Sequence, residues 1–220
     1  MVKIAPSIAA GDHGRLAEEA RMVEKAGADW IHIDIMDGKF APNFTFGPSL
    51  VKSLRKAVKI PLDCHLMLEA PEKYAERFIE AGGDYIVVHA EAVNQSTLGQ
   101  IEKSVKKAGR KLGVAFKPET ELSALDLKRT DISVVTVMSV NPGFSGQKFM
   151  PDVLPKISMA KSMFSQRGIE VEVDGGVDLE NARLVYTAGA SVLVGGNSVF
   201  GTMDPAQSIK DLKKIVGSSS

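Results

Sequence analysis

The chain has 220 residues, of which 44% are hydrophobic, so it can build one compact domain with a sizeable core. Its 27 basic residues equal its 27 acidic residues, and the formal net charge is zero. This balance argues against a protein that binds nucleic acid or a membrane surface, and we expect neither partner. An anionic substrate would have to be held by a local site.

Cys64 is the single cysteine, which excludes an intramolecular disulfide and suits a reducing compartment. We interpret it as a small buried residue. The first residues contain no long apolar stretch, so we expect no signal peptide, no transmembrane segment and a cytoplasmic location. Residues 217–220 are expected to form a frayed tail.

A repeat of about 27 residues runs along the chain. Ala-Gly pairs beginning at Ala26, Ala81, Ala108 and Ala188 each precede a short apolar run, and their spacings are 55, 27 and 80 positions. Glycine is common where a helix ends, because the next position often needs a left-handed backbone. About eight helix–strand units fit into 220 residues, which predicts an α/β fold of the (β/α)₈ TIM-barrel class, as a single domain over residues 1–220.

Hydrophobic periodicity gives the expected elements in chain order. We expect strands at 4–8, 30–35, 62–67, 85–89, 112–116, 132–138, 170–174 and 192–195. We expect helices at 15–25, 49–57, 72–81, 96–108, 153–164, 179–187 and 205–216. A doubly wound open sheet would share this alternation, but eight regular units favour closure, and no Gly-x-Gly-x-x-Gly dinucleotide fingerprint opens a first helix.

Polar side chains are predicted at the C-terminal ends of three strands, which is where such barrels carry their active sites. Strand alternation places His32 and Asp34 on the face opposite three isoleucines. The third strand contributes His65, and the seventh ends in Asp174. Two imidazoles and two carboxylates would suit one divalent metal ion, with Zn²⁺, Fe²⁺, Mn²⁺ and Co²⁺ all open.

Other polar residues are weaker candidates. Asp63 and Glu172 would lie deeper and orient the histidines. His89 ends the fourth strand, where it would either support the site or simply pack, whereas His13 is interpreted as a surface residue. The competing interpretation of the whole set is a group of interior polar side chains that satisfy one another.

Glycine-rich segments follow the last three strands, where barrels often bind phosphate. They are Asn141–Gln147, Asp174–Val177 and Gly195–Ser198. Glycines let backbone N–H groups approach a phosphate closely. Lys148 is a further possible partner, although such a lysine is more often simply solvated.

Six segments together resemble the ribulose-phosphate 3-epimerase family. They are Ala5–Ile8, His32–Gly38, Pro61–Met67, Val140–Phe144, Gly146–Phe149 and Glu172–Val177. The resemblance implies that His32, Asp34, His65 and Asp174 bind the metal and that Asp34 and Asp174 are the paired acid and base. It also implies substrate contacts at Ser7, Met36, His65, Met67, Met138, Gly143, Phe144, Ser145, Gly146, Gly175, Gly176, Gly196 and Asn197.

The chain differs from the family pattern at several positions, none of which is a candidate metal ligand. Ser145 stands for a glycine, Asn197 for a serine and Lys39 for a histidine, and Ile8–Asp12 lacks the common Leu-Ser-Ala-Asp run. These changes bear on substrate detail, so a hexulose phosphate, as in allulose-6-phosphate 3-epimerases, stays open beside D-ribulose 5-phosphate. The resemblance further implies a homo-oligomer, a dimer or larger.

The expected chemistry is removal of the proton at C3, beside the C2 carbonyl, and its return on the other face through an enediolate. Two other functions fit the sequence less well. A phosphate-binding barrel decarboxylase or aldolase would carry Asp-x-Lys-x-x-Asp, but Met36 stands two residues after Asp34. A non-catalytic barrel would have lost a ligand or a proton-transfer aspartate, and none is missing.

Overall fold

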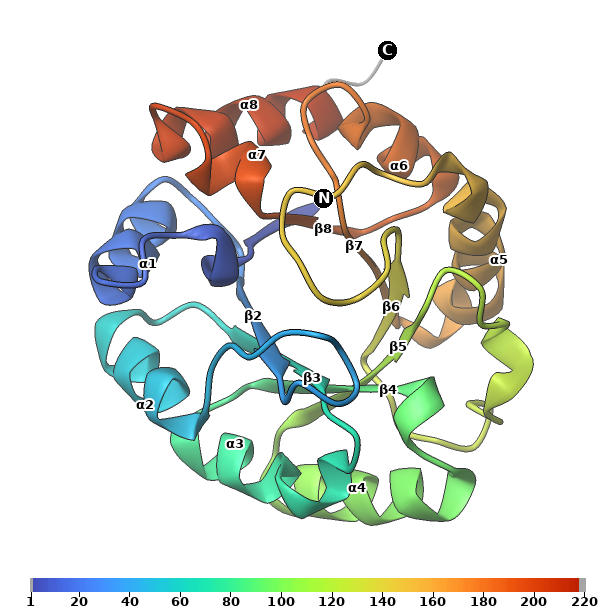
Figure 1. Cartoon of the computed structure of the whole chain (residues 1–220). Helices are drawn as coiled ribbons and strands as arrows, with labels where there is room; N and C mark the ends of the chain where they lie inside the picture. Colours follow the sequence, from blue (N-terminus) through green and yellow to red (C-terminus); the bar gives the residue numbers. More distant parts are fainter. Residues whose placement is uncertain (1, 218–220) are drawn as a thin grey trace.

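A computed structural model describes residues 2–217, which form a barrel of parallel strands surrounded by helices (Figure 1). The strands within this range are β1 (Lys3–Pro6), β2 (Ile31–Met36), β3 (Leu62–Met67), β4 (Tyr85–His89), β5 (Lys111–Phe116), β6 (Val134–Met138), β7 (Glu170–Asp174) and β8 (Val192–Gly195). The α-helices are α1 (Leu16–Lys25), α2 (Pro48–Ala57), α3 (Ala75–Ala81), α4 (Gln95–Lys107), α5 (Leu154–Phe164), α6 (Ala182–Ala188), α7 (Asn197–Phe200) and α8 (Pro205–Gly217).

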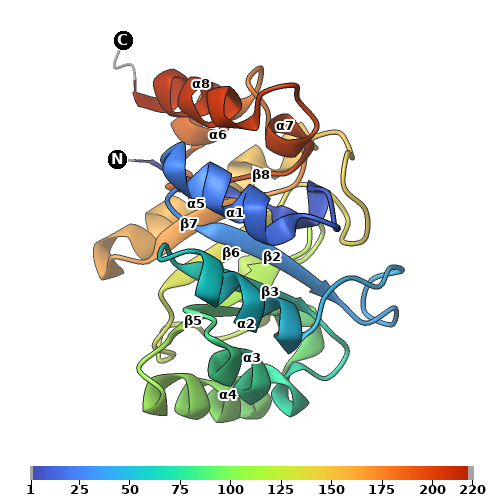
Figure 2. The same ribbon diagram turned by 90° about the vertical axis from the view of Figure 1, so that its left-hand side faces the viewer.

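The sheet closes on itself, which confirms the barrel and excludes the open doubly wound sheet. Parallel ladders join neighbouring strands from β2 through β8, and β1 pairs with β8. The remaining seam between β1 and β2 is closed by a bridge between Ser7 and His32 and by the hydrogen bond from the Asp29 N–H to the Ile4 carbonyl (2.9 Å). Seen from the side, the helices cover the outside of the strands (Figure 2).

Strand alternation separates two hydrophobic layers, as the sequence pattern predicts. The isoleucines of β2 and the apolar positions of β3, including Cys64, pack outward against the helices. A smaller cluster fills the inside of the barrel toward the N-terminal ends of the strands, where the rings of Trp30 and Tyr85 pack with their centroids 4.3 Å apart and their planes tilted by 33°. The same alternation leaves the inward positions at the strand C-termini for polar side chains.

Glycines end two of the helices as expected. Gly82 after α3 and Gly189 after α6 adopt φ angles of 107° and 119°, a region that residues with a Cβ rarely occupy. The chain can therefore turn directly from each helix into the next strand.

Several predicted boundaries were wrong by a few residues. β1 ends at Pro6 rather than Ile8, because Ile8–Ala10 forms a 3₁₀ turn, and β6 begins at Val134 rather than Ile132. The third helix is divided into a 3₁₀ turn at Pro71–Lys73 followed by α3. The sixth helix begins only at Ala182.

The C-terminal end differs from the sequence-based expectation in two ways. The short helix α7 was not predicted. Gly217 is the last residue of α8 rather than part of a tail, and residues 218–220 lie outside the described residues. No helix in the range 2–217 has the length and apolar character needed to cross a membrane.

Candidate active site

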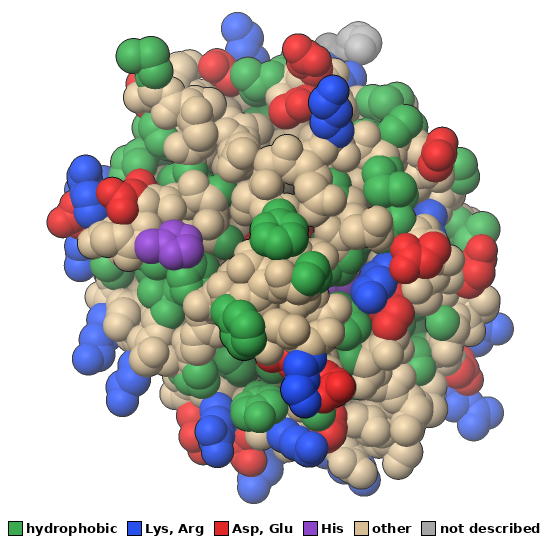
Figure 3. Space-filling view, viewed as in Figure 1, with side chains coloured by type: hydrophobic (Ala, Val, Ile, Leu, Met, Phe, Trp, Pro, Cys, Tyr) green, Lys and Arg blue, Asp and Glu red, His purple; other side chains and the backbone are tan. Residues whose placement is uncertain are grey.

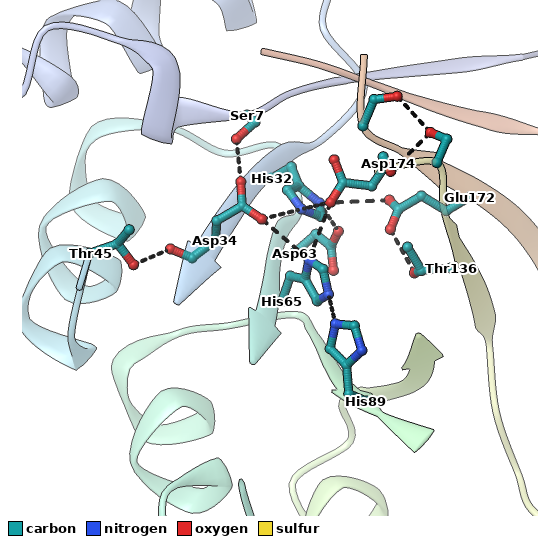
Figure 4. A network of polar contacts seen from close by, with 12 residues as sticks. Ser7, His32, Asp34, Thr45, Asp63, His65, His89, Thr136, Glu172 and Asp174 are labelled. Atoms are coloured by element: carbon teal, nitrogen blue, oxygen red, sulfur yellow. Dashed lines mark hydrogen bonds and ion pairs between the residues drawn. The ribbon is translucent and has the colours of Figure 1, made fainter. Parts of the chain in front are cut away.

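The four predicted metal ligands meet at the C-terminal end of the barrel (Figure 4). Asp34 Oδ1 lies 3.2 Å from His32 Nε2 and 3.3 Å from His65 Nδ1. Asp174 Oδ2 lies 3.6 Å and 3.5 Å from the same two nitrogens. The two histidines are fully buried and the two aspartates are each 8% exposed, so the cluster opens to solvent only on its carboxylate side.

Strand register brings these residues together. Asp34 on β2 pairs with His65 on β3, and Met138 on β6 pairs with Asp174 on β7. In a closed barrel the inward side chains at equal height converge from all sides. The cluster is therefore a consequence of register and closure.

The cluster carries more negative charge than its neighbours balance. Within the described range, the ion-pair partners of Asp34 and Asp174 are histidines, and no lysine or arginine contacts either carboxylate. Burial lowers the pKa of His32, but Asp34, Asp174 and Asp63 outweigh burial and raise this pKa well above its usual value. For His65 burial is likewise outweighed, by hydrogen bonds to Asp174 and Asp34, and its pKa rises to about 9. Both pKa values rise because the neighbouring carboxylates favour a positive charge at this position.

The donor set fits a divalent cation. Zinc–ligand distances of about 2.0–2.1 Å place tetrahedral ligand atoms roughly 3.3–3.4 Å apart. The four nitrogen–oxygen separations, 3.2 to 3.6 Å, lie around this value without any rearrangement. Imidazole with carboxylate is a ligand combination that several first-row transition metals accept, so it does not single out one of them.

Asp63 supports His32 from below. Its Oδ2 accepts a hydrogen bond from His32 Nδ1 at 2.7 Å, which leaves Nε2 directed at the cluster. Glu172 Oε2 lies farther from the same nitrogen, at 3.9 Å, and Glu172 Oε1 accepts a hydrogen bond from the Thr136 hydroxyl at 2.8 Å. The expected orienting role thus fits Asp63, whereas Glu172 makes no hydrogen bond to His32.

His89 supports His65 in a different way. His65 Nε2 lies 2.9 Å from His89 Nε2, and His89 Nδ1 lies 2.9 Å from Glu91 Oε2. Burial lowers the pKa of His89 to about 4, and for Glu91 the contact with His89 outweighs burial and lowers its pKa to about 2. Of the two interpretations left open for His89, the structure supports contact with the site, and Glu91 was missed although it follows His89 by two residues.

Asp34 is held by two further side chains. The Ser7 hydroxyl donates to Asp34 Oδ2 at 2.6 Å, and the Thr45 hydroxyl donates to the Asp34 carbonyl at 2.6 Å. Thr45 also accepts a hydrogen bond from the Met36 N–H. Ser7, expected as a substrate contact, therefore also orients the candidate base, while Thr45 lies in a long loop that gave no sequence signal.

A cavity of about 700 Å³ lies above the carboxylates. Asp34 and Asp174 form part of its wall, whereas His32 and His65 lie beneath it and do not line it. The other predicted contacts that line it are Ser7, Met36, Met67, Met138, Gly143, Phe144, Ser145, Gly146, Gly175, Gly176, Gly196 and Asn197. Lys148 lines it as well, but its side chain is exposed.

The space-filling view shows the same end of the barrel (Figure 3). Uncharged and hydrophobic side chains gather over its centre, and most lysine, arginine, aspartate and glutamate side chains lie toward the rim. Phe144, which lines the cavity, is 58% exposed. His13 is a surface residue as expected and packs beside Phe46.

The glycines of the cavity wall are not equivalent. Gly176 has φ 64°, and a Cβ there would lie 2.4 Å from the Phe149 nitrogen, so only glycine fits this close backbone approach. Gly196 has φ −90°, and a Cβ there would meet nothing nearer than Ala10 at 3.5 Å. A side chain at Gly196 would therefore have room to project beside the cavity.

Comparisons with known proteins identify the family of the chain. Residues 3–200 match the model of the ribulose-phosphate 3 epimerase family. The chain is 44% identical to the ribulose-phosphate 3-epimerase of Bacillus subtilis, over 97% of this chain and 99% of that protein. It is 42% identical to the enzyme of the same name from Synechocystis, over 96% and 93%.

Solved structures share the fold at lower identity. The 3-hexulose-6-phosphate synthase of Salmonella typhimurium superposes with a TM-score of 0.70 at 15% identity and covers 98% of each chain, which supports the barrel alone. The family model and the two epimerases cover nearly the whole chain. The chain therefore belongs to the ribulose-phosphate 3-epimerase family.

Proposed function

We propose that the chain interconverts D-ribulose 5-phosphate and D-xylulose 5-phosphate by moving a proton at C3. The observation that carries this proposal is the pair of carboxylates, Asp34 on β2 and Asp174 on β7, that both form part of the cavity wall. Epimerisation needs one group on each face of the reacting carbon, and two converging carboxylates can supply them.

Asp34 is suited to begin as a base. Burial disfavours its ionised form, but His32 and His65 outweigh burial and hold its pKa well below the usual value, so this carboxylate is ionised at neutral pH. The Ser7 hydroxyl holds one of its oxygens in place. Asp34 takes the proton next to the carbonyl and becomes protonated, which leaves an enediolate. Asp174, which must start this direction of the reaction as the carboxylic acid, returns its own proton to the other face, so the two groups end with exchanged protonation.

His32, Asp34, His65 and Asp174 would hold one divalent metal ion. When bound, such an ion acts as a Lewis acid that stabilises negative charge on the substrate oxygens. With the ion bound, the histidines would be neutral nitrogen ligands, and they do not line the cavity, so the proposed proton transfers stay with the carboxylates. Which metal is preferred among zinc, iron, manganese and cobalt stays a matter for metal analysis.

The phosphate would lie against the loops after β6, β7 and β8. Backbone N–H groups at Gly176 and Gly196 are the proposed donors. Asn197, which stands where the family pattern has serine, lies next to the loop after β6. A Cβ at Gly146 of this loop would lie 2.7 Å from the Asn197 amide nitrogen. The Asn197 side chain therefore packs closely against this loop.

A substrate panel tests the function. Enzyme reconstituted with each metal is assayed by NMR with ribulose 5-phosphate and with allulose 6-phosphate. Faster C3 epimerisation of the pentulose phosphate supports the proposal, whereas a preference for the hexulose phosphate would reassign the substrate within the same chemistry. Lack of C3 inversion with either sugar phosphate would overturn the proposal.

We also propose, from family membership, that the chain forms a dimer or a larger homo-oligomer in the cytoplasm. The buried Cys64 fits a reducing compartment. Light scattering during size-exclusion chromatography measures the mass in solution, and a mass near 23.6 kDa would contradict the oligomer.

A further inference from the structure

The supports of His32 and His65 differ in chemistry. His32 donates directly to the carboxylate of Asp63. His65 instead contacts a second imidazole, His89, which in turn contacts the carboxylate of Glu91. Two neutral imidazole nitrogens attract each other only if one carries a proton and the other does not, so the contact at 2.9 Å requires a defined direction.

Glu91 sets this direction. Its carboxylate can only accept hydrogen bonds, and its Oε1 already accepts one from the Lys117 backbone N–H at 2.8 Å. Its other oxygen, Oε2, must therefore accept from His89 Nδ1, which places the His89 proton on Nδ1 and leaves Nε2 with a lone pair. The Glu91 side chain is only 19% exposed and His89 is fully buried, so water has little access to this chain of contacts.

The lone pair on His89 Nε2 requires a proton on His65 Nε2. The neutral His65 ring then carries no proton on Nδ1, the nitrogen that faces Asp34 and Asp174. Nitrogen must be free of a proton to bind a metal, and a hydrogen bond at the other ring nitrogen is what commonly selects this form.

We propose that Glu91 is a positioning residue that acts through His89 to hold His65 in the tautomer that binds metal through Nδ1. This inference rests on the proposed metal site. Glu91 lies outside the cavity wall and touches no reacting atom, so its effect is on metal binding rather than on proton transfer.

The proposal gives an unusual ranking of two variants. In Glu91→Gln the Lys117 N–H must still meet an oxygen, so the amide NH₂ faces His89 and donates to it. His89 then carries its proton on Nε2, and His65 must carry its own on Nδ1, where the metal would bind. The Thr120 hydroxyl also bonds Glu91, but a hydroxyl can donate or accept and does not oppose this reversal.

Glu91→Ala removes the carboxylate without reversing the contacts, because water at the vacated position can accept from His89. We therefore expect the isosteric Gln variant to be worse than the truncation. Its affinity for Zn²⁺ should fall by roughly 10–100-fold, the usual range for groups that support a ligand, and the Ala variant should lose less.

Zn²⁺ dissociation constants by chelator competition measure the ranking. Side-chain ¹⁵N NMR of the metal-free protein, recorded well above the His65 pKa of about 9 so that this ring is neutral, reports which His89 nitrogen carries the proton. Glu24→Gln is the matched control: Glu24 Oε1 accepts two backbone N–H groups, so the new amide can turn toward solvent. We expect it to bind Zn²⁺ like the wild type.

The two readouts separate the proposals. Failure of the wild type to bind Zn²⁺ or another divalent ion contradicts the metal site, while the NMR comparison still tests the effect of Glu91. An unmoved His89 proton in Glu91→Gln, or an Ala variant that binds as poorly as the Gln variant, shows that Glu91 serves packing and overturns the inference.

Discussion

The two ends of the barrel differ in how their charged side chains are paired. At the N-terminal end of the strands, Lys3 pairs with Glu170 and lies 5.3 Å from the centre of the Trp30 ring. Lys111 donates to the Tyr85 hydroxyl there at 2.9 Å. Both cations have a partner of complementary chemistry within the chain.

At the C-terminal end, the ion-pair partners of the buried carboxylates are histidines. Asp34 and Asp174 are joined from below by Asp63 and Glu172, both of which are fully buried. Asp63 Oδ1 and Glu172 Oε2 have no hydrogen-bond partner among the described residues. Buried charge is costly unless it is paired, so this end is arranged to receive a cation and not for stability. The contrast fits the general division of such barrels into a functional and a stabilising end.

Removal of a metal ligand should have the largest effect and should be confined to the C-terminal end. His65→Ala and His32→Ala each take away one of the four proposed protein ligands, so we expect purified protein with little divalent metal and almost no epimerase activity. Elemental analysis beside a thermal melt measures both. Full stoichiometric metal in His65→Ala would rule out the proposed site.

Loss of one carboxylate should slow turnover without removing every partial step. Asp174→Asn should reduce kcat in both directions by ~10²-fold or more, the lower range for a general acid–base group. Asp34 would still reach one face, so one epimer should exchange its C3 proton in D₂O. Asp34→Asn should favour exchange from the other epimer.

Both aspartates are also proposed ligands, so metal content must be measured before these kinetics are compared. Deuterium wash-in at C3 of each epimer is the measurement. Near wild-type epimerisation by both metal-loaded variants would disprove the two-carboxylate mechanism.

The sequence predicted that the four candidate ligands converge. It did not predict the side chains that hold these ligands in place. Period-two alternation and strand ends identify His32, Asp34, His65 and Asp174, because these depend on local pattern and on closure alone. The contact between His65 and His89 depends on how adjacent strands stagger, which no local pattern reveals. The loop residue Thr45 and the helix α7 were missed for the related reason that tertiary contacts, not propensity, decide them.

A side chain at Gly196 should have an intermediate effect that appears in KM. Gly196→Val projects into open space near Ala10 and would crowd the backbone donors proposed for phosphate. We expect KM for the sugar phosphate to rise, while metal content stays near wild type. Gly176 is unsuitable for this test because a side chain would strain the backbone. An unchanged KM in Gly196→Val would contradict the loop assignment.

The smallest effect is expected at the N-terminal end, where Glu170→Gln should alter stability and leave catalysis intact. Burial disfavours the Glu170 carboxylate, but hydrogen bonds from Lys3 and Ser191 outweigh it and lower its pKa. A carboxyl whose pKa is lower in the folded state stabilises the fold above its unfolded pKa, near 4.3, and loses this contribution as pH falls through the folded value.

Solvent reaches this pair, since 27% of the Glu170 side chain is exposed, so we expect a loss of only about 1 kcal/mol at pH 7. The difference between variant and wild type should shrink as pH falls below about 4, because protonated glutamate and glutamine then bear the same charge. Urea unfolding at pH 7 and pH 3 measures it, and kcat at pH 7 provides the control. A pH-independent difference would mean that packing, not charge, explains the loss. A fall in kcat with full metal content would mean that the two ends of the barrel are coupled, which the separation of their charged groups argues against.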